Sequence, residues 1–454
     1  MILIRQGALV SAAGLRRADI LVAGEQIVAV ADAIREDDLA TLRAAHGLPN
    51  EAPQTIDAAG LLIFPGLIDA HAHMREPGAE HKEDWFTGTC AAVAGGVTTV
   101  LAMPNTSPAV TDPATFERAL GLARAKAVCD FGLYLGATNT NQRVAEQAPH
   151  LGECGLKIYM GSSTGDLLVQ DFEPQYEHFA RYPRERVIAV HAEHEPAVQY
   201  FARRGARRPP ICAELETARA ITLCRRLDRP THICHLSTAR EIEMVREAKS
   251  RGAPITCEAT PHHLFLTLDY ELQTRMLDGL RSQPPACYMM NPPLRELADL
   301  NALWDNLDAV DCIATDHAPH TLEEKRGAHP PSGVPGLETL LPLLLTAASG
   351  EYGPARLGLA DIARLCCEGP ARVFGLARKG TIAPGFDADL VLVDPGAAWS
   401  IGDRPIFSKC GWTPFAGWRA RGAVRQTFVR GRLAFDGHTV IAPMGSGRHV
   451  NPNG

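Results

Sequence analysis

Eight short apolar segments, separated by stretches with helical character, constrain the fold of this 454-residue chain most strongly. They fill the region from about residue 65 to residue 380, and segments 112–127, 213–227 and 238–251 between them have the helical pattern. Strands that alternate with helices form a parallel sheet, and eight such units can close a barrel. We therefore predict an α/β protein with a (β/α)8 TIM barrel. The expected strands are Leu62–Ile68, Thr98–Met103, Phe131–Leu135, Gly155–Tyr159, Val187–Val190, Thr231–Cys234, Ile255–Cys257 and Cys312–Thr315.

The two ends of the chain have β character without this alternation. Residues 18–30 contain two β-branched runs around Gly24-Glu25, which is the pattern of a hairpin. Residues 385–394 and 424–431 read as further strands, with no clear helix between them. We predict two domains, namely a small β-sandwich built from both termini (residues 1–64 plus 386–454) and the barrel (residues 65–385).

Two terminal segments have a weaker pattern. Residues 34–50 are charged and rich in Ala and Leu, so we expect a short surface helix within a tolerated insertion. The tail from Gly445 to Gly454 is polar and contains Gly and Pro, so we expect it to be frayed.

Composition excludes several classes of partner. The formal net charge is -7, which favours neither nucleic acid nor an anionic membrane. The basic pairs Arg203-Arg204 and Arg207-Arg208 are short and are interpreted as a solvated face. No apolar run is long enough to span a bilayer, and residues 1–7 read as a strand and turn, not as a secretory signal. The 12 cysteines include no Cys-x-x-Cys pair. A cytoplasmic protein with free thiols is therefore expected.

Two histidines follow the first expected barrel strand. His71 and His73 are separated by one residue, so in an extended strand both side chains leave the same face. Two imidazoles aimed at one point suit a metal ion. Arg75 follows two residues later, where a guanidinium could bind a carboxylate in a bidentate manner. Alone, this short motif is equally compatible with a strand that carries two structural histidines.

Four more ligand-type residues lie in or just after expected strands. They are Lys157, His191, His235 and Asp316. Active-site residues of such barrels lie at the carboxyl ends of the strands, and so many coincidences argue for one site.

A two-metal site accounts for the presence of a lysine among these residues. An ammonium cannot bind a metal, whereas a lysine carbamylated by carbon dioxide presents a carboxylate that can bridge two ions. His71, His73 and Asp316 would hold one metal and His191 and His235 the other, with carbamylated Lys157 and a hydroxide between them. Nitrogen and oxygen ligands favour two Zn²⁺, with manganese or cobalt as alternatives. His194 and His232 lie beside the proposed ligands and could exchange roles with them.

These motifs resemble the amidohydrolase superfamily and, within it, the dihydroorotases of the carbamylated-lysine type. The resemblance runs from about residue 60 to 385. It is carried by Asp69-Ala-His-Ala-His-Met-Arg-Glu-Pro-Gly78, Met103-Pro-Asn-Thr106, Gly155-Leu-Lys-Ile-Tyr-Met-Gly-Ser-Ser-Thr-Gly165, Asn291-Pro-Pro-Leu-Arg295 and Ala314-Thr-Asp-His-Ala-Pro-His320. The family implies a metal-dependent barrel that interconverts dihydroorotate and N-carbamoyl-aspartate in pyrimidine biosynthesis.

The resemblance also implies roles for individual residues. Asp316 would be the catalytic acid and base, and Ser163 and Thr164 resemble a lid over the substrate. Some family members have an aspartate in place of the lysine, so Asp166 is an alternative bridging residue to Lys157. The implied substrate contacts are Arg75, Asn105 and His320 to the carboxylate, Asn291 to the ring, and the backbone around Ser332 and Gly333.

The family further implies a small-molecule substrate and a homodimer, with an association with aspartate transcarbamoylase left open. Two rival functions remain. An allantoinase, hydantoinase or dihydropyrimidinase would act on rings without the carboxylate that Arg75 is expected to bind. A non-catalytic dihydroorotase-like subunit of aspartate transcarbamoylase would lack the metal ligands, all of which are present here.

Overall fold

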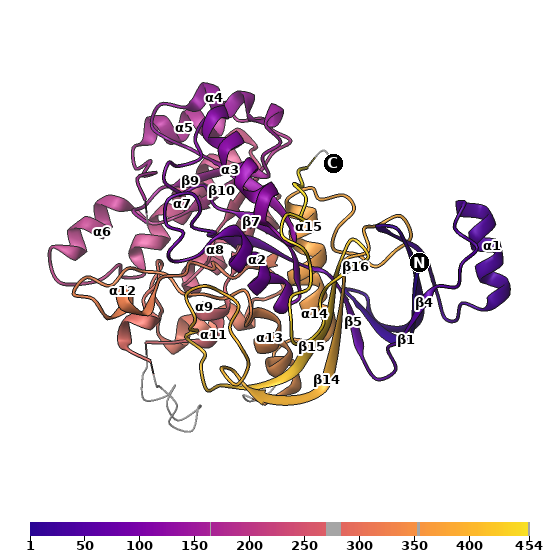
Figure 1. The fold of residues 1–454 in the computed structure, drawn as a ribbon. Helices are drawn as coiled ribbons and strands as arrows, with labels where there is room; N and C mark the ends of the chain where they lie inside the picture. Colours follow the sequence, from indigo (N-terminus) through magenta and orange to yellow (C-terminus); the bar gives the residue numbers. More distant parts are fainter. Residues whose placement is uncertain (164, 269–282, 352–354, 453–454) are drawn as a thin grey trace.

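The computed structural model describes residues 1–163, 165–268, 283–351 and 355–452, and they form a barrel and a second sheet beside it (Figure 1). The barrel consists of eight parallel strands in the order β13-β12-β11-β10-β9-β8-β7-β6. An isolated bridge between Ala72 and His317 brings the first and last strands together. The predicted barrel is thereby confirmed. Its strands are β6 (Leu67–Ala72), β7 (Val97–Ala102), β8 (Asp130–Gly136), β9 (Gly155–Tyr159), β10 (Ile188–His191), β11 (Thr231–Ile233), β12 (Ile255–Ala259) and β13 (Cys312–Ile313).

Helices surround the barrel, and several begin at side-chain caps. Asp84, Asp112 and Thr238 each accept a hydrogen bond from the backbone three residues later, which satisfies an otherwise unpaired donor. The helices outside the barrel are α2 (Trp85–Ala94), α3 (Pro113–Lys126), α4 (Gln142–Gln147), α5 (Phe172–Arg181), α6 (Glu195–Ala202), α7 (Ile211–Leu227), α8 (Ala239–Ser250), α9 (Pro261–Phe265), α11 (Leu297–Asp305), α12 (Leu322–Arg326), α13 (Leu340–Ser349), α14 (Leu359–Ala363) and α15 (Gly369–Val373). Shorter helical turns are η1 (Ala148–His150), η2 (Pro285–Tyr288) and η3 (Arg364–Glu368).

The second sheet combines both termini, as predicted. Its order is β16-β15-β14-β5-β1-β2-β3, and β4 pairs with β1. The predicted hairpin is present, because β2 and β3 pair in antiparallel fashion around Gly24-Glu25. The strands are β1 (Ile2–Ser11), β2 (Gly14–Ala23), β3 (Gln26–Ala31), β4 (Gln54–Asp57), β5 (Leu62–Pro65), β14 (Leu390–Ser400), β15 (Arg419–Val429) and β16 (Arg432–Phe435).

The expected single strand Leu62–Ile68 is two strands. β5 pairs with β14 in the terminal sheet, and β6 pairs with β7 in the barrel. The break lies at Gly66, where an added Cβ would lie 2.1 Å from Oγ1 of Thr98 and 2.8 Å from Cβ of Asp389. The chain therefore passes from one sheet to the other at a position where only glycine fits without movement of its neighbours.

The expected surface helix is α1 (Glu36–His46), which lies far from the barrel in Figure 1. Leu39 is its buried residue, and it packs with Leu3, Leu21 and Ile34 in a small cluster on the terminal sheet. This contact explains how an otherwise exposed, charged helix stays attached.

The expectation of a frayed tail is wrong for the described residues up to 452. The backbone N–H of Phe131 donates to the carbonyl of Arg448 at 2.9 Å, and the N–H of Val450 donates to the carbonyl of Phe131 at 2.8 Å. The tail thus pairs with the start of β8, and these backbone bonds were not visible in its polar composition.

A buried ion cluster connects the barrel to the segment that leads into β14. Nζ of Lys379 lies 2.6 Å from Asp130, 3.0 Å from Asp387 and 2.7 Å from Asp389. These three carboxylates are close enough to hold a cation, and the lysine supplies it. Burial alone would lower the pKa of Lys379, but the carboxylates of Asp389 and Asp387 raise it, so the ammonium stays charged.

Two further features bear on the cellular setting of the protein. All twelve cysteines are free and buried. Among the helices of the described residues, none combines the length and apolar character needed to cross a membrane.

Candidate metal centre and substrate pocket

Three of the predicted ligands meet at the carboxyl end of the barrel. His71 lies near the end of β6 and His73 just beyond it, while Asp316 follows β13. Oδ1 of Asp316 lies 3.0 Å from Nε2 of His73 and 3.3 Å from Nε2 of His71. All three residues are buried. One carboxylate oxygen therefore faces two imidazoles in a space of the size of a metal coordination sphere.

Two more predicted ligands lie beside this group. His191 ends β10, and His235 follows β11. Nδ1 of His191 lies 3.0 Å from Nε2 of His235, and the His71 and His235 rings are 5.3 Å apart. Within the described part of the chain, Nδ1 of His235 has no hydrogen-bond partner. Two imidazole nitrogens that face each other need a proton or a cation between them.

The protonation states of these groups suit metal binding. Burial lowers the pKa of His73 to about 4 and also lowers the pKa values of His191 and His235. Burial alone would raise the pKa of Asp316, but His71 and His73 bring it well below its usual range. Neutral imidazole and ionised carboxylate are the forms that bind metals.

His71 differs from the other three histidines. Burial and the nearby Lys157 lower its pKa, whereas the carboxylates of Glu258 and Asp316 raise it to about 10. The negative charge around His71 thus holds a proton in the absence of a cation, and a bound cation can take the place of that proton. The donor set fits a metal centre, because it joins nitrogen and oxygen ligands in a buried, negatively charged space.

Lys157 lies in the middle of β9 and is completely buried. Its Nζ is 2.9 Å from Sγ of Cys234, and none of the described carboxylates forms an ion pair with it. Asp166, the alternative bridging residue, is exposed. Carbamylation would turn this buried side chain into a carboxylate, which metal ions at the neighbouring histidines would neutralise.

The two histidines that could exchange roles with the ligands lie differently. His194 is partly buried and precedes α6. His232 is buried and lies 2.9 Å from the hydroxyl of Thr256 and 3.1 Å from Oε2 of Glu258. Both ring nitrogens of His232 are thus occupied, whereas His191 and His235 face each other beside His71, so they remain the better candidates.

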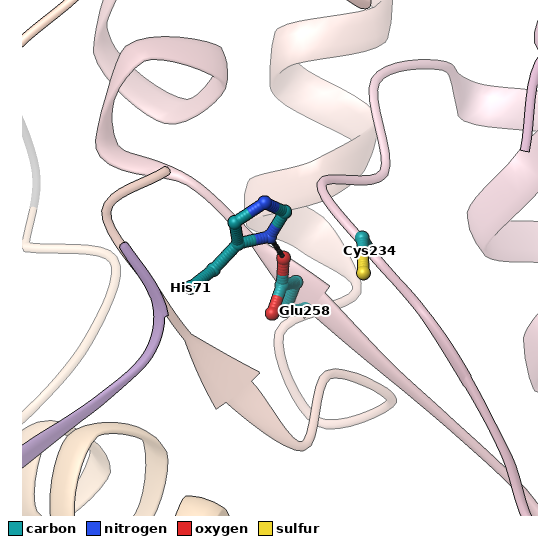
Figure 2. A group of neighbouring side chains, drawn as sticks. All are labelled: His71, Cys234 and Glu258. Atoms are coloured by element: carbon teal, nitrogen blue, oxygen red, sulfur yellow. Dashed lines mark hydrogen bonds and ion pairs between the residues drawn. The ribbon is translucent and has the colours of Figure 1, made fainter. Parts of the chain in front are cut away.

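Sequence reasoning missed Glu258 and Cys234. Nδ1 of His71 lies 2.5 Å from Oε1 of Glu258, and Figure 2 shows the ring and the carboxylate facing each other with Cys234 alongside. The three residues form a second group of potential ligand atoms within 4.8 Å, and it shares His71 with the first group. A carboxylate at the second nitrogen of a ligating histidine fixes the orientation of the ring. A signal for Glu258 was available in the sequence, because this residue directly follows the expected strand Ile255–Cys257.

A small pocket opens beside His73 and Asp316. It brings together residues from six separate regions of the sequence. The lining residues are His73, Arg75, Asn105, Ser163, Asn291, Asp316, Ala318, Ser332 and Gly333. Oδ1 of Asn105 lies 2.7 Å from Nδ1 of His73. The other residue of the expected lid, Thr164, lies outside the described residues.

His320 does not line the pocket and lies behind Arg75. Its Nε2 is 3.2 Å from Nη2 of Arg75 and 3.0 Å from the carbonyl of Ser332, and its Nδ1 is 3.2 Å from Nζ of Lys82. Burial and the positive charges of Arg75 and Lys82 lower the pKa of His320 far below its usual range. A neutral His320 can therefore support Arg75 at the pocket wall.

Arg75 is buried but remains a cation. Burial lowers the pKa of its guanidinium to about 10, which is still well above neutral pH. Its Nε donates to the carbonyl of Pro319 at 3.1 Å. A fixed guanidinium in a small polar pocket is suited to binding a carboxylate.

Backbone strain is concentrated at this site. Arg75, His235 and Asp316 have positive φ values of 59°, 38° and 45°. Left-handed conformations are unfavourable for residues other than glycine and often mark functional sites. Here they occur just after barrel strands, where the chain must turn away while the side chain keeps its position.

A larger cavity of about 400 Å³ lies elsewhere, between the loop after β13 and the connection from β14 to β15. Its walls include Trp399, Phe407 and His317, but none of the predicted metal ligands. Its lining is mainly apolar, so the cavity does not provide an alternative set of ligands for the metal centre.

An arginine pair expected to be solvated instead reaches the site. Arg208 is buried, and its guanidinium contacts the carboxylate of Glu193. Oε2 of Glu193 in turn lies 3.1 Å from Nε2 of His191. The interpretation of Arg207-Arg208 as a solvated face is therefore wrong for Arg208. No local pattern reveals this contact, because Glu193 and Arg208 are brought together only by the loop that follows β10.

Comparison with family models supports the reading of the motifs. Residues 60–139 match the model described as Dihydro-orotase-like, and residues 294–434 match that of the Amidohydrolase family. The first match contains His71, His73 and Arg75, and the second contains Asp316.

Curated relatives include both single-function and multifunctional proteins. The dihydroorotase of Pyrococcus abyssi is 38% identical over 84% of this chain and 85% of that protein. The multifunctional protein CAD of Squalus acanthias is 41% identical over 86% of this chain. The matched region spans 16% of the length of that protein.

Solved structures resemble the whole chain. The L-hydantoinase (dihydropyrimidinase) from Arthrobacter aurescens has a TM-score of 0.86 and 26% identity, and the match covers 99% of each chain. The dihydropyrimidinase from Brevibacillus agri has a TM-score of 0.85 and 27% identity, covering 99% of this chain and 98% of that one.

Proposed function

The chain belongs to the dihydroorotase family of the amidohydrolases, and we propose that it catalyses the reversible hydrolysis of (S)-dihydroorotate to N-carbamoyl-L-aspartate. The observation that carries the proposal is the position of Arg75. Its guanidinium lines the same pocket as His73 and Asp316, so a carboxylate at one end of a ring could be bound while the other end meets the metal ligands.

We further propose that the centre holds two zinc ions. His71, His73 and Asp316 would bind one, His191 and His235 the other, and carbamylated Lys157 would lie between them. When bound, such ions lower the pKa of water and polarise a carbonyl group. The buried position of Lys157 and the exposure of Asp166 support the choice of the lysine.

Asp316 is proposed as the general base and acid. It is ionised, because its pKa lies well below the usual range, so it can accept a proton as water adds to the ring carbonyl carbon. When the carbon–nitrogen bond breaks, the proton returns from Asp316 to the leaving nitrogen. Its buried carboxylate beside His71 and His73 has the fixed position that such a transfer requires.

Substrate contacts follow from the pocket lining. Arg75 and Asn105 would bind the carboxylate, with His320 supporting Arg75. Asn291 would contact the ring, together with the backbone at Ser332 and Gly333. Ser163 lines the pocket and, with Thr164, is proposed to form part of a lid.

The setting of the enzyme is also a proposal. The buried free thiols support a cytoplasmic protein, and a homodimer is retained from the family resemblance. The matched region spans 16% of the multifunctional relatives. An association with aspartate transcarbamoylase is proposed from the family resemblance alone. The division into residues 1–64 plus 386–454 and residues 65–385 agrees with the change of sheet at Gly66.

A substrate panel tests the proposed function. The purified chain would be assayed with dihydroorotate, allantoin and dihydrouracil under the same conditions. We expect turnover of dihydroorotate and at most weak turnover of the two rings without a carboxylate. Preferential hydrolysis of dihydrouracil would instead assign the activity named for the structural neighbours and would overturn the role of Arg75. A purified chain that binds no metal and turns over none of the three rings would favour the non-catalytic alternative.

A further inference from the structure

The segment between α6 and α7 reaches two different parts of the site through adjacent arginines. Arg208 is only 8% exposed and has a positive φ of 45°. A strained arginine backbone persists only where surrounding contacts hold it. One such contact is to its own carbonyl, which accepts a hydrogen bond of 2.6 Å from Nη1 of Arg295.

Arg208 connects an outer carboxylate to the loop after β9. Its Nη1 contacts Oε2 of Glu193, and its Nη2 donates to the carbonyl and hydroxyl oxygens of Ser162 at 2.5 and 2.9 Å. Ser162 precedes Ser163, which lines the substrate pocket. One guanidinium thus links the Ser162 loop with the carboxylate that faces His191.

Glu193 is in position to orient His191. It is completely buried, and its Oε2 lies 3.1 Å from Nε2 of His191, close enough for an ion pair although the angle does not give a hydrogen bond among the described residues, while Nδ1 of the same ring faces His235. A carboxylate at the second nitrogen of a ligating histidine fixes the ring and its tautomer, and loss of such a partner typically costs about 10–100-fold in metal affinity. A planar guanidinium holds a carboxylate in a way that the ammonium of lysine does not.

Arg207 contacts two other residues that line the pocket. Its Nη2 lies 2.9 Å from the hydroxyl of Ser332, 3.4 Å from Oδ1 of Asn291 and 3.2 Å from the carbonyl of Met290. Asn291 and Ser332 both line the pocket but come from different segments. One nitrogen of this exposed guanidinium therefore bridges two groups that would contact the substrate ring.

We propose that Arg207 and Arg208 are positioning residues of the site: Arg208 holds Glu193 against the metal ligand His191, and Arg207 holds Asn291 and Ser332 at the substrate pocket. The Arg207 part rests on the proposed function, whereas the Arg208 part requires only a metal at His191. Arg208 acts through a proposed metal ligand and Arg207 through the substrate pocket. The two variants should therefore have different effects.

The test compares R207Q and R208K with R203Q, in which a nearby exposed arginine is changed. Metal affinity would be measured by competition with a chromogenic chelator, and kcat and KM with dihydroorotate. We expect R208K to bind the metal with an affinity about 10–100-fold lower than that of the wild type. We expect R207Q to keep its metal but to raise KM about tenfold, with kcat within about twofold. R203Q should match the wild type in all of these values.

The outcomes separate the two parts of the proposal. Wild-type metal affinity in R208K would overturn the role of Arg208, and a KM in R207Q equal to that of R203Q would overturn the role of Arg207. If R208K fails to fold, E193Q replaces it, and the same loss of metal affinity is expected. If the wild type does not hydrolyse dihydroorotate, the proposed function fails and the role of Arg207 fails with it, while the chelator competition still decides the role of Arg208.

Discussion

Nε2 of His73 lies 3.0 Å from Oδ1 of Asp316, although the two residues are 243 positions apart in the sequence. The first and last strands of the barrel create this contact, because β6 and β13 become neighbours only when the sheet closes. The pair joins a proposed metal ligand to the proposed proton carrier, and both line the pocket that contains Arg75.

Replacing Asp316 by asparagine should abolish catalysis without emptying the pocket. The amide cannot accept the proton in the same way, and general acid–base groups contribute typically about 10²–10⁴-fold. We expect the kcat of D316N to fall by at least about 10²-fold, while the variant still binds substrate and keeps part of its metal. Equilibrium binding of dihydroorotate and elemental analysis would check this, and near-normal turnover would rule out the role of Asp316.

Replacing Arg75 by glutamine should affect rings that carry a carboxylate most strongly. Removal of one partner of a buried charge pair costs about 2 kcal/mol or more, which is roughly 30-fold in affinity. We expect R75Q to raise KM for dihydroorotate by at least this factor. Any slow hydrolysis of dihydrouracil by the wild type should change little in R75Q. An equal loss on both rings would show that Arg75 supports the fold or the metal and does not recognise the carboxylate.

Replacing Lys379 by methionine should destabilise the whole chain. The change leaves Asp130, Asp387 and Asp389 buried without their shared cation, and such losses cost about 3–5 kcal/mol. Urea denaturation would measure the free energy of unfolding. The control is R378M, because Arg378 is exposed and lies 3.6 Å from the same Asp387, so its loss should cost no more than about 1 kcal/mol. Equal stability of the two variants would contradict the importance of the cluster.

Glu216 should make stability fall as pH rises. Burial raises its pKa to about 7, against a usual value of 4.5, and only Arg219 and Gln175 oppose the shift. Between these pH values the folded chain holds a proton that the unfolded chain has lost, so unfolding becomes easier as pH increases. This loss of unfolding free energy is largely complete once the pH exceeds about 8, and it is absent below about pH 4.5.

The variant E216Q measures this contribution. Its amide oxygen can still accept the hydrogen bond from Nε2 of Gln175, but the side chain no longer titrates. From pH 5 to pH 8, the wild type should lose about 2–3 kcal/mol of unfolding free energy relative to E216Q. Urea midpoints at both pH values would test this, and a constant difference between the two proteins would refute the assignment.

The barrel and the grouping of the proposed ligands could be predicted because each follows a local rule. His71, His191 and Asp316 stand in or just after apolar strands, and parallel strands bring such positions to one edge. Glu258 also directly follows an expected strand, Ile255–Cys257, so the same rule marks it. Its contact with His71 forms only when the barrel closes and has no local signal in the sequence.

Other features depend on contacts that no local pattern reveals. Arg208 has the sequence surroundings of a solvated residue, and only the approach of Glu193 and Ser162 buries it. The polar composition of the tail likewise predicts a free segment, whereas its backbone forms hydrogen bonds with the backbone of Phe131. In both cases tertiary contacts override the composition of a short segment.

Metal dependence would be measured as dihydroorotate hydrolysis by one preparation before metal removal, after metal removal and after return of zinc, with the bound metal counted each time. We expect turnover to disappear with the metal and to return as about two zinc ions bind per chain. Unchanged hydrolysis by the metal-free chain would rule out the proposed metal-dependent reaction.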